Sequence, residues 1–212
     1  MKRLVTLALI ALLSTAASAE AKTIYAGFGL SHSTADLATY NPVKGFSPAY
    51  DHSELGGRFD YWNMLKPNYA LNFNLNLGFF SETNKPGVFA PAAPEGKYSQ
   101  SSVSVRLGGD RVWSPLPNTH VFMGPGVEYW VGKAKFEDIG GITGTYETKN
   151  VTRWSLHGHT GAIFEMGSNW GISGQLGHRL GIASYKEAGS KTSWMPSSLD
   201  GAMEVVFKFG GK

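Results

Sequence analysis

The chain has no cysteine, so no disulfide bond contributes to its stability. Charged residues make up only 17% of the sequence, and no basic patch indicates nucleic-acid binding. Beyond the first 19 residues there is no continuous apolar run long enough to cross a bilayer as a helix. These absences exclude a disulfide-stabilised domain and a helical membrane protein, and they leave no indication of a nucleic-acid partner.

The first residues have the pattern of an export signal. Two basic residues precede an apolar run over residues 4–13, and the small-x-small sequence of residues 17–19 follows. This pattern predicts a secretory signal peptide over residues 1–19, with cleavage before Glu20 or, alternatively, after Ala21. Loss of the two basic residues would lower the formal charge of the chain from +3 to +1.

Residues 20–212 are enough for a single domain. The sequence contains 27 glycines and 13% aromatic residues. This mixture is typical of a protein built from many curved strands whose ends are rich in aromatic rings.

The clearest secondary-structure signal lies in residues 70–80. Apolar side chains alternate there with asparagine and glycine, and alternation with a period of two is typical of a strand with two different faces. The apolar face comprises Leu71, Phe73, Leu75, Leu77 and Phe79, and the polar face comprises Asn72, Asn74, Asn76 and Gly78. Such a strand suits a boundary between hydrocarbon and a polar interior.

The same pattern predicts eight strands and an all-β fold. The expected strands cover residues 22–31, 53–62, 70–80, 98–113, 120–136, 146–166, 170–183 and 199–209. Short connections at 63–69, 114–119 and 167–169 alternate with longer ones at 32–52, 81–97 and 184–198 and with a glycine-rich hairpin at 140–144. Short turns at one rim and long loops at the other are typical of an antiparallel up-and-down transmembrane β-barrel with both termini at the short-turn rim.

The polar strand faces can point inward or outward, and each choice gives a different class of protein. A soluble barrel binding an apolar ligand would turn its apolar face inward, whereas a membrane barrel would turn it outward. The extent of the apolar face, the signal peptide and the unequal loops favour the membrane barrel. We therefore expect a polar network inside the barrel, formed by Arg58, Asp60, Arg106, Asp110, Glu128, His157, His159, Glu165, Arg179, Glu204 and Lys208.

Antiparallel hairpins give expected neighbours for three of these side chains. Arg106 should lie opposite Glu128, and His157 should lie opposite Arg179. A third hairpin predicts that Arg58 lies beside Asn72. In an eight-stranded barrel such partners fill the lumen, so we interpret the set as structural.

Aromatic residues gather where the expected strands meet the short turns. Aromatic rings favour the membrane interface, so this group predicts a periplasmic girdle. Its members are Tyr25, Tyr61, Trp62, Tyr69, Trp113, Phe122, Phe164, Trp170 and Phe209.

One group of residues has the composition of a chemical site. Ser155, His157 and His159 share a strand face and are followed by Glu165, so the histidines could bind a metal with a third ligand, or His157 could activate Ser155. Their parity points them into the lumen, away from acyl chains. We therefore predict no catalytic residue, no metal and no cofactor, and keep a lipid A deacylase or acyltransferase as the enzymatic alternative.

The strand count, the parity, the loop asymmetry and the closing Phe207-x-Phe209 resemble the small eight-stranded outer-membrane barrels, which include the barrel of outer-membrane protein A and the opacity-type surface proteins. The resemblance implies a non-enzymatic structural or surface-interaction protein of the cell outer membrane with a plugged interior. The partners it implies are outer-membrane lipid and lipopolysaccharide, the barrel assembly machinery and a surface ligand of the long loops. Gly210, Gly211 and Lys212 depart from the aromatic ending of that family.

Overall fold

The computed structural model describes residues 23–36, 51–84, 96–137, 144–147, 151–187, 190–194 and 197–210. The expected signal peptide and most of the long connections lie outside these residues. No helix that is long and apolar enough to span a membrane occurs in the described part of the chain.

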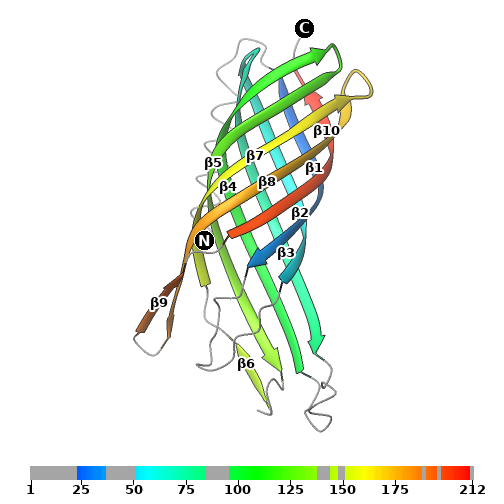
Figure 1. Cartoon of the computed structure of the whole chain (residues 1–212). Helices are drawn as coiled ribbons and strands as arrows, with labels where there is room; N and C mark the ends of the chain where they lie inside the picture. The colour runs from blue at the N-terminus through cyan, green and yellow to red at the C-terminus, as the bar shows by residue number, and fades with distance from the viewer. Residues whose placement is uncertain are drawn as a thin grey trace.

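The described residues form one antiparallel sheet that closes into a barrel (Figure 1). The barrel wall consists of eight strands, which are β1 (Ile24–Asp36), β2 (Asp51–Lys66), β3 (Tyr69–Asn84), β4 (Gly96–Leu116), β5 (Thr119–Glu137), β7 (Val151–Glu165), β8 (Trp170–Glu187) and β10 (Ser197–Phe209). The short strands β6 (Thr145–Glu147) and β9 (Ser190–Trp194) extend β5 and β8 as hairpin arms. Each wall strand pairs with its sequence neighbours in the wall, and β10 pairs with β1 to close the ring. The predicted eight-stranded antiparallel barrel is therefore confirmed.

Two strand predictions need correction. The strand expected over residues 146–166 is represented by β6 and β7, with residues 148–150 outside the described part of the chain. Strands β2, β3, β4 and β5 also run further than expected toward the short turns. Pro67 and Asn68 alone connect β2 to β3, after a register shift between Met64 and Lys66.

Both ends of the barrel wall meet at the short-turn rim. Ile24 lies opposite Phe209 in the pairing of β1 with β10, and the short turns lie at the same end as the C-terminus (Figure 1). At the other end, β4 and β5 extend beyond the ends of β1 and β2. We call the first end the periplasmic end and the second the extracellular end, following the orientation that the loop lengths predict.

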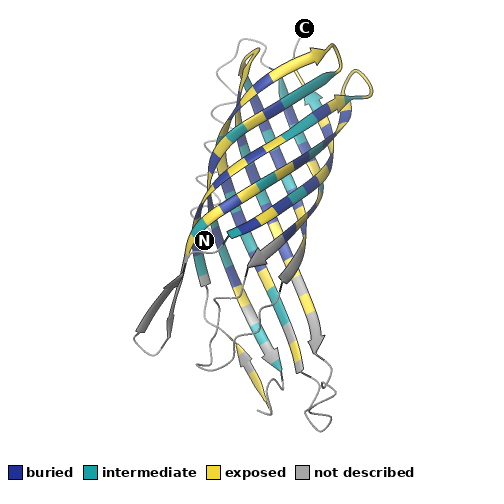
Figure 2. Cartoon of the chain, viewed as in Figure 1, coloured by how far each residue is buried: buried dark blue, intermediate teal, exposed yellow. Residues whose placement is uncertain are grey.

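Burial alternates along every wall strand, which gives the barrel a chequered pattern (Figure 2). Apolar side chains point outward, so that Leu107 is 63% exposed and Leu156 is 71% exposed. Most of the described charged side chains in the wall point inward, so that Arg106 is 1% exposed and Glu204 is 4% exposed. This distribution is the reverse of a soluble protein's and contradicts the soluble-barrel alternative, because water would meet a largely apolar wall.

Candidate functional site: the barrel lumen

The lumen holds a dense cluster of buried charges, which we call the lumen network. Its charged members come from six strands and are Arg58, Asp60, Arg106, Asp110, Glu128, Arg153, His157, His159, Arg179, Asp200 and Glu204. The set contains four arginines, five carboxylates and two histidines. Strand parity explains their position, because residues two apart on a strand share a face and the outward face is occupied by apolar side chains.

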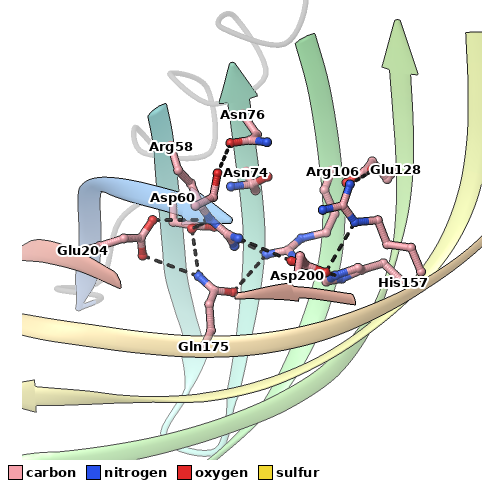
Figure 3. Close-up of polar contacts among 12 residues, drawn as sticks. Arg58, Asp60, Asn74, Asn76, Arg106, Glu128, His157, Gln175, Asp200 and Glu204 are labelled. Atoms are coloured by element: carbon pink, nitrogen blue, oxygen red, sulfur yellow. Dashed lines mark hydrogen bonds and ion pairs between the residues drawn. The ribbon is translucent and has the colours of Figure 1, made fainter. Parts of the chain in front are cut away.

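Arg106 on β4 lies at the centre of this network (Figure 3). Its Nη2 donates to the Asn72 Oδ1 atom at 3.2 Å and approaches the Gln175 Oε1 atom at 3.4 Å and the Asp60 Oδ1 atom at 3.5 Å. Its Nη1 lies 3.0 Å from the Nδ1 atom of His157. One guanidinium therefore connects strands β2, β3, β7 and β8 across the lumen.

Arg58 forms the second centre. It contacts Asp60 on its own strand, and it lies 3.5 Å from Glu204 and 3.7 Å from Asp200 on β10. Gln175 supports the same carboxylates, because its Nε2 donates to Asp60 Oδ2 at 2.9 Å. These contacts join β2 to β8 and β10, so they link strands that are not adjacent in the wall.

The third group of charges lies nearer the extracellular end. Glu128 Oε1 accepts hydrogen bonds from Arg153 at 3.0 Å and from Arg179 at 3.2 Å. The Nε atom of Arg179 also lies 3.3 Å from Asp200 Oδ1. Because each arginine in the lumen network has a carboxylate partner within 4 Å, burial leaves none of these cations uncompensated.

Both ring nitrogens of His157 are occupied by hydrogen bonds. Nε2 lies 2.9 Å from Asp200 Oδ1, an acceptor, so it carries the proton, and Nδ1 then accepts from Arg106. The Ser155 hydroxyl is buried and has no hydrogen-bond partner among the residues that the structure describes. His157 and Ser155 therefore do not form the nucleophile and base pair that activation of the serine would require.

His159 and Glu165 also depart from the hypothetical chemical site. The His159 ring stacks on that of His157 and lies 2.9 Å from Asp110. Glu165 lies at the periplasmic end, where it contacts Tyr25, His120 and Lys208. No group of three or more metal-ligating side chains occurs in the described ranges, and the contacts of Glu165 are at the periplasmic end rather than with the two histidines.

An apolar plug closes the lumen on the periplasmic side of the network. Its members are Tyr25, Trp62, Ala70, Val112, Phe122, Ile163 and Val206, all buried and packed together. The rings of Trp62 and Phe122 lie 5.6 Å apart between centroids, and Phe122 contacts the ring of His159 in the lumen network. The plug therefore separates the lumen network from the periplasmic end.

The plug corrects part of the expected aromatic girdle. Tyr25, Trp62 and Phe122 are at most 3% exposed and lie inside the barrel, because each occupies an inward position on its strand. The other expected girdle residues lie on the outer wall near the short turns, namely Tyr61, Tyr69, Trp113, Phe164, Trp170 and Phe209. Their role as interface anchors stays a prediction.

The register decides which expected neighbours meet. Arg106 lies opposite Glu128 and His157 opposite Arg179, as predicted. The pairing of Arg58 with Asn72 is wrong, because Arg58 lies opposite Asn76. The two-residue turn moves the register of this hairpin by four positions. Asn72 instead reaches Arg106 on the next strand.

Several members of the lumen network were missing from the sequence prediction. They are Asp200, Arg153, Gln175 and Ser173. Asn72, Asn74 and Asn76, which the sequence placed on the polar face of their strand, are buried in the lumen as well. Asp200 is the most consequential, because it contacts His157, Arg179 and Arg58. Strand parity places it on the inward face, but parity alone gives no contact across the lumen.

A glycine on β8 makes room for these contacts, and its replacement gives the first experimental prediction. A Cβ atom at Gly177 would lie 2.4 Å from His157 Nε2 and 2.8 Å from Asp200 Oδ1. We expect Gly177→Ala to lower the free energy of unfolding by about 1–3 kcal/mol, as overpacking typically does. Urea unfolding in detergent measures the change.

Gly174→Ala is the matched control on the same strand. A Cβ atom at Gly174 meets nothing within 4 Å, so this variant should unfold at the wild-type urea concentration. Equal unfolding midpoints for the two variants would contradict the packing described around His157.

Comparisons with known proteins agree on the fold. Ail, the attachment invasion locus protein of Yersinia pestis, was solved in complex with the heparin analogue sucrose octasulfate; it is 14% identical, with a TM-score of 0.51 over 90% of this chain and 100% of Ail. The outer membrane protein OprG of Pseudomonas aeruginosa is 11% identical, with a TM-score of 0.50 over 91% of this chain and 98% of OprG. A major outer membrane protein of Thermus thermophilus is 15% identical, with a TM-score of 0.50 over 87% and 99% of the two chains.

No protein-family model and no curated protein sequence matches the chain. At these low identities the structural likenesses show the fold alone, which is that of the small outer-membrane barrels. The resemblance inferred from the sequence is thus confirmed at the level of the fold.

Proposed function

We propose that this chain is a non-enzymatic protein of the outer membrane, a closed barrel that anchors an extracellular surface and does not conduct solutes. The observation that carries the proposal is the double closure of the lumen, by the lumen network and by the apolar plug beneath it. An eight-stranded barrel is just wide enough for side chains to fill it. The fold and the apolar outer wall support the location in the outer membrane.

The hydrogen bonds at both ring nitrogens of His157 support the non-enzymatic part of the proposal. A histidine that accepts from Arg106 and donates to Asp200 has no free nitrogen with which to activate a nucleophile. The side chains also point into the lumen, whereas the acyl chains of lipid A lie outside the wall. Recognition at the surface would then fall to the extracellular end, because loops on a rigid scaffold carry most binding residues.

Conductance and fractionation test the proposal together. The purified mature protein should produce no stepwise conductance in planar bilayers, and cell fractionation should recover it in the outer membrane, with mobility in SDS gels that changes on boiling. Deletion of the protein and His157→Ala should both leave the lipid A acyl profile unchanged. Stepwise conductance would overturn the closed lumen, and an altered acyl profile would overturn the non-enzymatic assignment.

A further inference from the structure

The cations on the outer wall are concentrated on two neighbouring strands. Apart from Lys66, which lies next to a short turn on β2, the described outward-facing lysines and arginines are Lys97 and Arg111 on β4 and Lys133 and Lys135 on β5. With Lys66 set aside, the outward positions of the other wall strands carry no lysine or arginine among the side chains the structure describes. Among the described side chains, the outward-facing cations therefore gather on one side of the wall.

Lys133 lies where the apolar wall ends. On β4 the apolar band extends over the outward positions from Trp113 to Val103, an interval of ten residues. For a strand tilted by about 40°, ten residues cover about 25 Å along the barrel axis. Val103 pairs with Val131 on β5, and Lys133 is the next outward position. This places its ammonium group at the level expected for the headgroups of the outer leaflet.

A surface hollow of about 430 Å³ lies at this level. Its lining residues are Phe79, Ser81, Ser99, Gln100, Ser101 and Lys133, from β3, β4 and β5. The register makes them neighbours, since Phe79 pairs with Ser101 and Ser101 pairs with Lys133. Three small serines between an aromatic ring and a lysine leave the space that forms the hollow.

Three polar side chains in the hollow are available to a ligand. Lys133 and the hydroxyls of Ser99 and Ser101 make no hydrogen bond or ion pair with any residue in the described part of the chain. Lys135, two positions along the same face, is instead neutralised by an ion pair with Glu137. Of the two lysines on this face of β5, Lys133 alone is therefore poised to bind an anion.

We propose that this hollow binds the phosphorylated headgroup of an acylated glycolipid in the outer leaflet, of the lipid A type. Lys133 and the serine hydroxyls would hold a phosphate, because ammonium and hydroxyl groups both donate hydrogen bonds to its oxygens. Phe79, which is 62% exposed, would lie against the first part of an acyl chain on the membrane side. The proposal rests on the outer-membrane location proposed above, which is where such a lipid would be met.

Lipid retention in detergent tests this site without depending on cell location. The full mature chain, refolded in detergent, is mixed with bisphosphorylated lipid A, and bound lipid is counted by native mass spectrometry. We expect Lys133→Gln to retain roughly fivefold less lipid A than wild type, the loss typical of one basic residue near a charged membrane surface. Lys133→Arg should retain the wild-type amount. A boiling-dependent shift in SDS gels would show that each variant is folded.

Lys135→Gln is the matched control, since Lys135 lies on the same face but is already paired. Three other probes separate the sources of phosphate: dephosphorylated lipid A, phosphatidylglycerol and inorganic phosphate. Weak retention of all three, with retention of lipid A unchanged in Lys135→Gln, supports the proposal. Equal retention by wild type and Lys133→Gln, an equal loss in Lys135→Gln, or equal binding of phosphatidylglycerol or free phosphate would overturn it. Any of these failures leaves the conductance test unaffected.

Discussion

Arg106→Met should lower the free energy of unfolding of the barrel by about 3–5 kcal/mol, the usual effect of removing one partner from a buried ion pair. Arg106 is 1% exposed and contacts Asp60, Asn72, Gln175 and His157. Without it, three arginines would face five carboxylates in the lumen. Urea titration in detergent, followed by the loss of resistance to cold SDS, measures the effect.

Arg111→Met is the control for this variant, on the same strand and with the same change in charge. Arg111 lies on the outer wall, where it hydrogen-bonds to Tyr69 and lies over its ring. Its replacement by an apolar side chain should change the free energy of unfolding by no more than about 1 kcal/mol, the upper range for exposed polar contacts. Equal losses of unfolding free energy in the two variants would mean that the contacts of Arg106 inside the lumen stabilise the barrel no more than an exposed contact does.

The double variant Asp60→Asn with Arg106→Met separates charge balance from lost contacts. Removing one carboxylate restores the charge balance that Arg106→Met disturbs. The double variant should therefore lose less free energy of unfolding than the two single variants lose together. Contacting residues typically show couplings of about 0.5–3 kcal/mol. Strict additivity would show that Arg106 and Asp60 act independently, contrary to the 3.5 Å approach of their side chains.

Trp62→Ala should have a comparably large effect, because Trp62 fills the centre of the apolar plug. Its side chain is 1% exposed and packs against Phe122. Replacing a buried tryptophan with alanine leaves a cavity and typically costs about 3–5 kcal/mol. The urea midpoint of the boiling-dependent gel shift measures the change without relying on tryptophan fluorescence.

Trp113→Ala makes the same chemical change on the outer wall near the same end of the barrel. Trp113 is 45% exposed, so less apolar contact with the protein is lost, and the destabilisation should be clearly smaller. A larger loss for Trp113 than for Trp62 would indicate that the membrane interface, and not the lumen, depends on aromatic rings at this end.

The fold was predictable because one physical rule governs most of the chain. Strands in this wall present apolar side chains to one side and polar side chains to the other, so alternation reveals both the strands and the inward set. Arg58, Arg106 and Glu204 were identified in this way and are buried. The rule works because one face of each strand meets hydrocarbon and the other meets the charged lumen, so the two faces differ in polarity.

The plug was missed although parity contained the signal. Trp62 shares the inward face of β2 with Arg58 and Asp60, and Phe122 shares the inward face of β5 with Glu128. An aromatic ring near a strand end suits either the membrane interface or a narrow lumen, so composition alone favoured the wrong side. Parity decides between the two.

The contacts across the lumen could not be derived from the sequence. Hairpin register depends on turn length. The sequence predicted a connection of seven residues between β2 and β3, whereas the structure has two. Asp200 meets His157 and Arg58 from strands that are not its neighbours in sequence. Such contacts follow from the closure of the ring, which no local pattern encodes.

The meeting of Ile24 and Phe209 at one rim makes the order of the strands around the ring independent of where the chain is cut. A short linker joining these positions, with new termini at Pro67 and Asn68, would give a circular permutant with the same wall. In that permutant the seam between β1 and β10 becomes an ordinary hairpin, and β2 and β3 become the outermost segments of the polypeptide. The order of the strands along the chain would change, while every ladder hydrogen bond of the barrel would keep its partner.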